Sequence, residues 1–227
     1  MSLWQFTVHY IAFYLVDIGD HGRQSDGSVY HNSNLGYAIE NNLLNIPPSS
    51  KLPNSECVMP YVFVGDDAFG LKPHMMKPYP LQNLPVGKRV YNYRLSRARR
   101  VVENVFGIAA SRFRIFRRPI IGLVDKVVVI TKAAVALHNF LMSLSTTENN
   151  YSYCPSGYAD RETLDNFVPD QWRKDTESLT GIRDLTHTGS NNYSKQAAAI
   201  RDEFKRYFNC EGAVDWQLNI VTNTGRN

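Results

Sequence analysis

The stretch YNYRLSRARRVVENVFGIAASR, residues 91–112, contains no proline and only short β-branched runs. Within it, Val101, Val105 and Ile108 recur at helical spacing, which places their side chains on one face of a helix. Most of the charged residues in this stretch are arginines. We therefore predict a long amphipathic helix over residues 91–112 that packs its apolar face on a core.

Strand and helix signals alternate before this helix. The segment YIAFYLVDI at 10–18 is rich in aromatic and β-branched residues and predicts a strand. The pair Asn32-Ser33 can cap a helix over residues 35–44. The run YVFV at 61–64 is short and continuously apolar, which favours a strand that is buried on both faces.

The segment after the long helix is apolar enough to raise the question of a membrane span. Residues 120–142 have about the length of a span, but they carry Asp125, Lys126 and Lys132. Each such charge costs about 3 kcal/mol at the centre of a bilayer. We therefore predict a buried strand or helix pair of a soluble domain, with no membrane as partner. Residues 131–144, TKAAVALHNFLMSL, have the composition of a helix. His138 in this segment is predicted to be a core histidine with satisfied ring nitrogens.

The rest of the chain is polar up to a last helix. Residues 145–193 contain scattered charges and many Asn, Ser and Gly residues, which predicts loop or disorder. Ile200, Phe204 and Phe208 then share one face of a helix over residues 194–208, with Ser194 as its cap. The alternation of strands and helices predicts an α/β domain with a partly disordered C-terminal extension.

The composition excludes several classes of protein. Of the 227 residues, 43% are apolar, which suffices for a core of ordinary density, and the net charge is +4. Cys57, Cys154 and Cys210 form no C-x-x-C pair, so a disulfide framework and a cysteine zinc site are both unsupported. These cysteines indicate reduced thiols of an intracellular protein. Nucleotide-binding, serine-hydrolase and zinc-protease motifs do not occur.

Acidic residues supply the sharpest candidates for chemistry, and each has a simpler interpretation. Asp66 and Asp67 follow the predicted strand at 61–64, and ligands bind beyond the carboxyl ends of strands in open α/β sheets. Either aspartate could instead cap the turn that follows. Asp26 precedes Gly27, and this pair is typical of a turn.

Glu103 lies on the long helix, away from the apolar stripe. One turn later, Gly107 has no side chain to crowd the carboxylate. A glycine inside a helix costs about 0.5–1 kcal/mol, so we expect a packing or access reason for it. The simpler interpretation of Glu103 is a solvated side chain that pairs with Arg99 or Arg100 at helical spacing.

Basic residues concentrate around Glu103. Ten of the chain's 25 lysines and arginines lie between Lys88 and Arg118, and nine of these ten are arginines. Guanidinium groups bind phosphates bidentately, so the segment could bind a nucleic-acid backbone. It could equally be a solvated helix face. The candidate DNA-binding residues are Arg94, Arg97, Arg99, Arg100, Arg112 and Arg114.

Three segments taken together resemble one family. They are VDIGDHGRQSDGSVYHNS at 16–33, YVFVGDDAFGLKPHMMKPYP at 61–80 and YNYRLSRARRVVENVFGIAASRFRIFRRPI at 91–120. They closely resemble the core of PIF/Harbinger-type transposases and the nucleases derived from them, which are DDE superfamily endonucleases. The likeness runs from about Phe13 to about Gln217, and the motifs occur in the family's order.

The resemblance implies an RNase H-like fold, a mixed sheet flanked by helices, in which carboxylates bind Mg²⁺ or Mn²⁺ for phosphodiester cleavage and strand transfer. Carried over motif by motif, Asp26, Asp66 and Glu103 fall on metal ligands, with Asp66 and Glu103 as catalytic residues. Asp67 doubles the strand-end acid. The resemblance also implies DNA and a Myb-like DNA-binding protein as partners. It places the protein in the nucleus, with the cytoplasm as a second compartment.

The likeness departs from the family at its start. Family members carry an upstream helix-turn-helix-like region and a first strand with another metal-binding aspartate, and we expect this chain to be truncated past both. The expected organisation is a non-matching segment at 1–12, a nuclease-like domain at 13–144 without its first strand, a polar linker at 145–193 and a C-terminal helix and tail at 194–227. The segment at 1–10 could pair in place of the missing strand, although it brings no carboxylate.

Two functions stay open at this point. The first is a metal-dependent DNA endonuclease domain derived from a transposase. It is active only if its metal site functions without the first aspartate. The second is a catalytically dead remnant that binds DNA or a protein.

Overall fold

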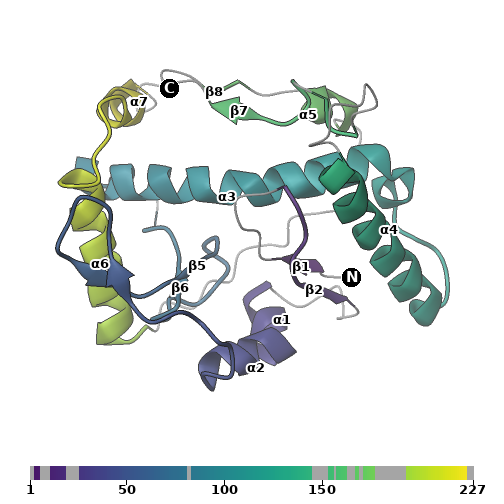
Figure 1. Ribbon diagram of the computed structural model, residues 1–227, viewed down its shortest axis with the longest axis horizontal. Helices are drawn as coiled ribbons and strands as arrows, with labels where there is room; N and C mark the ends of the chain where they lie inside the picture. The colour runs from purple at the N-terminus through teal and green to yellow at the C-terminus, as the bar shows by residue number, and fades with distance from the viewer. Residues whose placement is uncertain are drawn as a thin grey trace. The chain divides into compact units, whose positions relative to one another are not determined.

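A computed structural model describes the greater part of the chain, namely residues 3–5, 11–18, 26–80, 83–144, 153–155, 157–162, 167–168, 171–176 and 193–223. The chain divides into two compact units. The first consists of Met1–Gly22 and Arg100–Leu185, and the second of Arg23–Arg99 and Thr186–Asn227. The long helix α3, Val86–Arg112, contributes residues to both units (Figure 1).

Helices and short strands alternate in a way that is compatible with the α/β class. The remaining elements in chain order are β1 Leu3–Gln5, β2 Val16–Ile18, α1 Asp26–Asn32, α2 Asn34–Glu40, β3 Ser50–Lys51, β4 Val58–Met59, β5 Phe63–Val64, β6 Met75–Met76, the 3-10 turn η1 Arg114–Arg117, α4 Val124–Leu144, β7 Arg161–Glu162, β8 Phe167–Val168, α5 Gln171–Thr176, α6 Lys195–Asn209 and α7 Gln217–Asn223. Among the described residues, every sheet has two strands, and only β5 and β6 pair in parallel.

The long helix forms where the apolar stripe predicts it, and it is longer than predicted. It begins at Val86 because the chain enters it directly after Pro85, whose carbonyl accepts hydrogen bonds from the backbone of Lys88 and Arg89. Val105 and Ile108 have no exposed surface and Val101 is half-buried, which confirms burial for the later part of the stripe. The helix runs for 27 residues to Arg112.

In the first unit, α3 packs on an extended segment near the N-terminus. Phe13 joins Val105 and Ala109 in one core cluster, and its ring meets Phe106 edge-on at 5.6 Å. The amide of Asn139 holds the backbone of Phe13 by two hydrogen bonds, of 2.8 and 2.6 Å. The predicted strand at 10–18 was too long, because only its last three residues form β2.

The N-terminal segment pairs as we expected it could. β1 and β2 run antiparallel, with Leu3 opposite Ile18 and Trp4 opposite Asp17.

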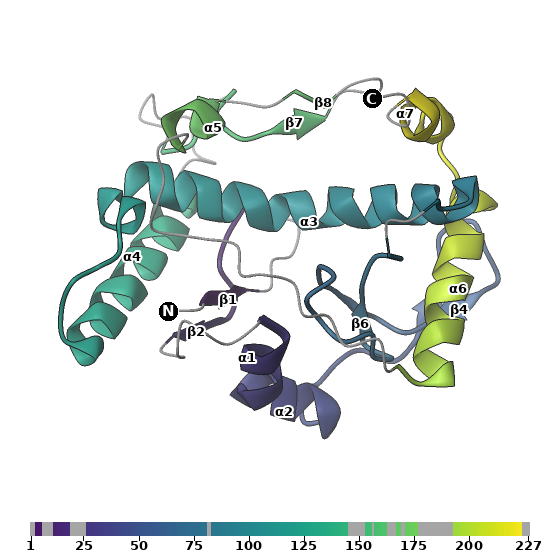
Figure 2. The same ribbon diagram turned by 180° about the vertical axis from the view of Figure 1, so that it is seen from behind.

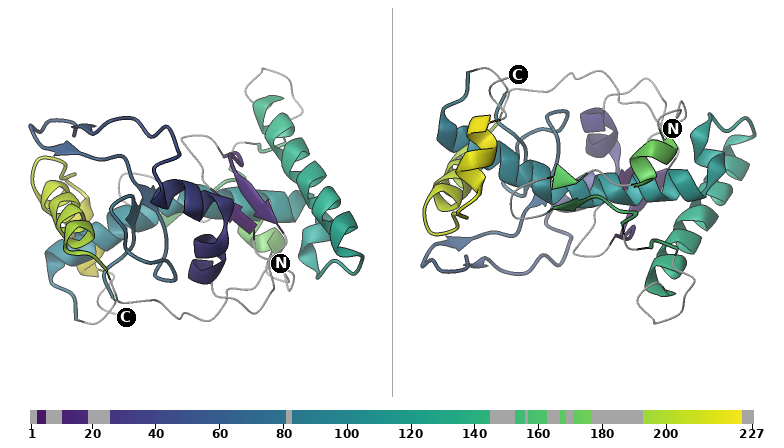
Figure 3. Two further views of the ribbon diagram at one scale, coloured as in Figure 1. Left: turned by 90° about the horizontal axis from the view of Figure 1, so that it is seen from below. Right: turned by 90° about the horizontal axis from the view of Figure 1, so that it is seen from above.

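The prediction for residues 120–142 included a helix, which is confirmed, but the pair of elements and the full burial were wrong. A single helix, α4, replaces the predicted buried strand or helix pair (Figure 3). Much of it is exposed, including the side chains of Val129, Leu137 and Phe140. By length and composition, α4 could cross a membrane. One such helix in a chain is weak evidence for a membrane span. The absence of a membrane partner therefore stays a prediction.

The described parts of residues 145–193 include buried side chains and regular elements, which corrects the prediction of loop or disorder for them. Tyr158 and Trp172 join Ile108 of α3 in a buried cluster. The pair β7–β8 and α5 belong to the same segment. The rest of this segment lies outside the described residues.

The second unit is built around the first half of α3 and the helix α6. Tyr91 and Leu95 of α3 pack with Tyr79, and Phe204 and Phe208 of α6 lie against them. A second cluster joins β6 to α6 through Met76 and Ala197 (Figure 2).

The two predicted helix caps of this unit are confirmed. Ser194 caps α6 by accepting from the backbone of Ala197 at 3.1 Å. Ser33 likewise caps α2, which ends at Glu40, sooner than predicted. The strand at 61–64 shortens to β5 and is half-buried, so its predicted burial on both faces was wrong.

His138 of α4 is fully buried with both ring nitrogens bonded. Nε2 lies 3.1 Å from the carbonyl of Ile11 and must donate to it, so Nδ1 accepts from the hydroxyl of Tyr153 at 3.1 Å. This confirms the predicted core histidine. Burial lowers the pKa of His138 below its ordinary value of 6.5, and the bond to Ile11 opposes the shift.

Acid should therefore destabilise the protein through His138. With a lowered pKa in the folded state, the unfolded chain binds more protons, so the free energy of unfolding falls as the pH drops below about 6.5. Denaturant unfolding measured at about pH 7.5 and about pH 5 should show a larger loss in the wild type than in His138→Gln, whose amide does not titrate. Equal losses in the two proteins would contradict this role.

Candidate active site

The strand-end acid lies at the carboxyl edge of the parallel pair β5–β6. The backbone of Gly65 continues the pairing by donating to the carbonyl of Met76 at 2.9 Å, and Asp66 follows directly. Asp66 Oδ1 accepts from the backbone of Ala68 at 3.0 Å, so the turn cap considered from the sequence does form. Oδ2 lies 3.9 Å from the guanidinium of Arg99. One carboxylate thus both fixes the turn and faces a cation.

Asp26 begins the helix α1, which corrects the prediction of a turn at this pair of residues. The next residue, Gly27, comes so close to the segment after Asp66 that an added Cβ would lie 2.5 Å from the carbonyl oxygen of Ala68. Tyr30, one turn further on, meets the ring of Phe69 at 5.7 Å. The start of α1 therefore lies against the turn that Asp66 caps. The side chain of Asp26 lies outside the described residues.

Lys77 is a residue of this edge that the sequence did not single out. It follows β6 directly, whereas Gly65 separates Asp66 from β5, and its Nζ donates to the backbone carbonyl of Asp67 at 3.2 Å. Its side chain is buried. Burial lowers the pKa of Lys77, and the charge of Asp67 opposes the shift. We predicted no strand at Met75–Met76 from the sequence. The parallel pairing of β5 with β6, which brings the ammonium of Lys77 to this edge, was therefore not predicted.

Glu103 belongs to the first unit and is 46% exposed at its side chain. Its described ionic partner is Arg173 of α5, whose Nη2 lies 3.5 Å from Oε2. The structure therefore keeps Glu103 partly solvated, as the simpler interpretation had it, and adds a partner that this interpretation did not name. Arg173 lies 70 residues further along the chain, a separation at which sequence spacing gives no signal.

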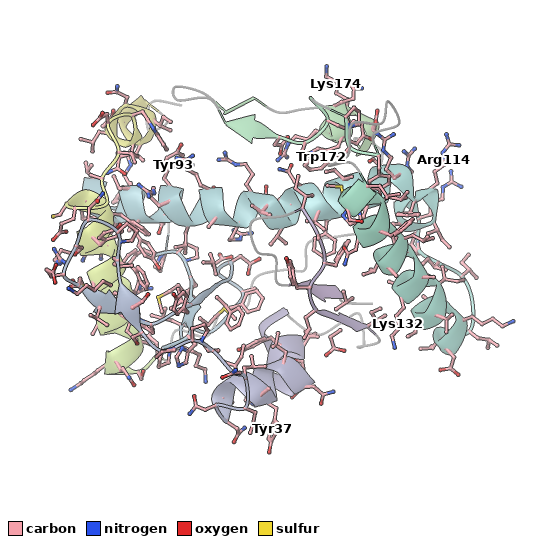
Figure 4. The ribbon with its side chains drawn as sticks, viewed as in Figure 1. Tyr37, Tyr93, Arg114, Lys132, Trp172 and Lys174 are labelled. Atoms are coloured by element: carbon pink, nitrogen blue, oxygen red, sulfur yellow. The ribbon has the colours of Figure 1, made fainter. Side chains whose placement is uncertain are left out.

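Gly107 has the packing reason that its place in a helix suggested. Trp172 lies against it so closely that an added Cβ would come within 2.1 Å of the indole ring (Figure 4). The indole Nε1 donates to the side-chain oxygen of Asn104 at 2.9 Å. Asn104 also holds the backbone of Asp160, by accepting from its N–H at 3.0 Å and donating to its carbonyl at 3.3 Å. The turn of α3 that carries Glu103 thus anchors the segment that brings Arg173.

Several candidate DNA-binding arginines have partners within the protein. Arg94 donates to the carbonyl of Gly212 and to the side chain of Gln217, and desolvation lowers its pKa. Arg97 stacks on Trp216 at 4.1 Å. These partners come from the C-terminal segment, which the sequence predicted only as a helix and tail.

The second half of the arginine segment is more open to solvent. Arg112 is exposed and stacks on Tyr158 at 4.1 Å. Arg114 is exposed in η1, just after α3 ends (Figure 4).

A family model described as DDE superfamily endonuclease matches residues 7–139, more than half of the chain. The chain belongs to this family. The matched range contains Asp26, Asp66 and Glu103 and begins before Phe13, from which we traced the likeness. Comparisons with the curated proteins and with the solved structures gave no match.

The candidate ligands of this family member are distributed over both units. Asp26 and Asp66 belong to the second unit, where the contact of Gly27 with Ala68 brings their segments together. Glu103 belongs to the first. Within the described part of the chain, no three His, Cys, Asp or Glu residues converge as a metal site.

Asn104 should contribute strongly to stability. Asn104→Ala removes the acceptor of a buried indole N–H and of the Asp160 N–H, so we expect the free energy of unfolding to fall by about 2–4 kcal/mol. Denaturant unfolding of the full chain measures this. Ser96→Ala, at an exposed position of the same helix, is the control and should change stability by less than about 0.5 kcal/mol. A similar small change for Asn104→Ala would refute the anchoring role.

Proposed function

We propose that this chain is the metal-dependent endonuclease domain of a transposase-derived nuclease that cleaves phosphodiester bonds of DNA. The observation that carries the proposal is the family match over residues 7–139, which includes the three candidate ligands Asp26, Asp66 and Glu103. We further propose the Harbinger subfamily and an RNase H-like arrangement. Both rest on the motifs quoted from the sequence.

The donor set suits a hard divalent cation. Carboxylate oxygens are the ligands that Mg²⁺ and Mn²⁺ prefer. Asp66 keeps 27% of its side chain exposed, and Glu103 keeps 46%, so solvent reaches both carboxylates. When bound, the metal would activate a water or a 3′ hydroxyl and stabilise the leaving oxygen.

Contacts within the protein orient Asp66, one of the two proposed catalytic acids. The bond from the backbone of Ala68 fixes one oxygen of Asp66, which directs the other toward Arg99. The guanidinium of Arg99 lies 3.9 Å from Asp66, and we propose that it binds a phosphate held near that carboxylate. These contacts place a cationic group beside a ligand carboxylate, as binding of a phosphodiester requires.

Nicking of supercoiled plasmid DNA in Mn²⁺ tests the proposal. Asp66→Asn and Glu103→Gln keep the side-chain shape but remove a metal-binding charge, so each should lower the nicking rate by at least about 100-fold. Asp125→Asn removes the same charge from an exposed position of α4 and should leave the rate unchanged. Wild-type nicking equal to that of Glu103→Gln would refute the catalytic assignment.

The second candidate function is a remnant that binds DNA or a protein without cleaving it. The observation that favours it is that no cluster of three metal-ligating side chains occurs in the described part of the chain. DNA binding that needs no Mn²⁺, together with nicking unaffected by Glu103→Gln, would select this function over the first.

For DNA binding, we assign the phosphate contacts first to Arg100, Arg112 and Arg114. Arg112 and Arg114 are exposed, and Arg100 is half-buried on the same helix as Arg112, about three turns before it. Arg94 and Arg97 are engaged in packing against the C-terminal segment. A Myb-like DNA-binding partner and a location in the nucleus, with the cytoplasm as a second compartment, remain proposals from the family resemblance.

A salt titration of DNA binding separates these two groups of arginines. Each phosphate contact contributes a slope of about −0.9 to the dependence of log K on log salt for double-stranded DNA. Arg114→Gln should therefore make this slope shallower by about 0.9, the contribution of one phosphate contact. It should leave the melting temperature unchanged. Arg94→Gln should instead lower the melting temperature, because Arg94 is bonded inside the protein. Affinity that does not depend on salt would contradict backbone binding.

A further inference from the structure

Arg173 stands between two carboxylates of the first unit. Its Nε lies 3.0 and 2.9 Å from the two oxygens of Asp160, and its Nη2 lies 2.5 Å from Oδ2. The same Nη2 lies 3.5 Å from Oε2 of Glu103. The carboxylate of Asp160 is fully buried, whereas Arg173 and Glu103 are 37% and 46% exposed.

The place of this guanidinium is fixed from both sides. Asp160 is held through its backbone by Asn104, the residue after Glu103. Trp172, the residue before Arg173, fills the space over Gly107 and bonds the same asparagine. Arg173 therefore approaches Glu103 in a geometry set by the turn of α3 that carries Glu103, and an ordinary surface ion pair lacks such supports.

The charges of the three groups leave Glu103 available to a cation. Asp160 neutralises Arg173 through the closer and bidentate contact, so the trio keeps one net negative charge. The guanidinium approaches Oε2 of Glu103 at 3.5 Å, a distance longer than that of a good charged hydrogen bond. An arginine without Asp160 would be free to close on Glu103 and compete with a metal for it.

From this arrangement we propose that Arg173, anchored by Asp160, is a positioning residue that orients the Glu103 carboxylate for metal binding. The inference rests on the proposed function, because it takes Glu103 as a metal ligand. Partners of this kind hold ligating groups in place, and their loss typically weakens metal binding or activity by about 10-fold or more. Residues 153–176 lie beyond the family-matched range, so this support comes from outside it.

The test compares Mn²⁺ binding and stability in the full chain. The double variant Arg173→Gln/Asp160→Asn replaces the ion pair by two amides, which can still bond each other and leave no buried charge unpaired. We expect a melting temperature close to that of the wild type and Mn²⁺ binding about 10-fold weaker by calorimetry. The Mn²⁺ concentration for half-maximal nicking should rise by the same factor.

A second variant covers the case in which the double variant unfolds. Arg173→Lys keeps a positive charge for Asp160 but cannot present two fixed N–H groups to two carboxylates. It should melt near the wild type and still lose Mn²⁺ affinity. Unchanged Mn²⁺ affinity in a variant that folds would overturn the positioning role, and so would tighter binding, which would make Arg173 a competitor of the metal.

Glu103→Gln separates failure of the inference from failure of the proposed function. If Glu103→Gln binds Mn²⁺ as tightly as the wild type, Glu103 is not a ligand, and both are overturned. If Glu103→Gln binds more weakly and the Arg173 variants bind normally, only the role of Arg173 is overturned.

Discussion

On the two longest helices, α3 and α4, asparagine side chains hydrogen-bond to the backbone of extended segments and hold them against the helix. Asn104 and Asn92 on α3 each bond the N–H and the carbonyl of one residue, Asp160 and Tyr79 respectively. Asn139 on α4 holds Phe13 in the same way. An asparagine amide offers one acceptor and donors in the arrangement of a peptide group, so it can take the place of a neighbouring strand. Isolated pairs of short strands are at best marginally stable, and attachment to a helix compensates for this.

The Asn104 contact matters most because it lies next to Glu103. It fixes Asp160, which anchors Arg173, and it accepts the indole N–H that seats Trp172 over Gly107. A buried polar group that loses one hydrogen-bond partner costs free energy. The bonded set of Asn104, Asp160 and Trp172 therefore favours a single arrangement of these residues. The other proposed ligands have a different support. Asp66 is held by its own turn after β5, and α1 is held by the close approach of Gly27 to Ala68.

Features encoded locally could be predicted from the sequence. The 3.6-residue periodicity predicted α3, and the caps Ser33 and Ser194 predicted the starts of α2 and α6. The run VVVI inside residues 120–142 favoured a strand by composition, but no proline or glycine interrupts 123–144, and Asp125 suits the first turn of a helix. The local signal thus supported one helix, and our assumption of full burial misled the interpretation.

Contacts between distant residues could not be predicted in the same way. Phe13 and Asn139 are 126 residues apart, and Arg173 reaches Glu103 across 70 residues. No periodic pattern links such positions. The three acids of the candidate site came from resemblance to a family, whereas the partners of Glu103 and the engagement of Arg94 with the C-terminal segment needed the structure. Sequence reasoning therefore proposed the acids and missed the contacts that hold them.

The most direct test of the central claim is a crystal structure of the full chain with Mn²⁺, in which anomalous scattering locates the metal. Our account predicts Mn²⁺ within about 2.3 Å of carboxylate oxygens of Asp26, Asp66 and Glu103, with any second ion about 3.5–4 Å away. It also predicts that Arg173 stays bonded to Asp160. Mn²⁺ bound elsewhere, or a Glu103 carboxylate that contacts only Arg173 in a crystal saturated with Mn²⁺, would contradict it.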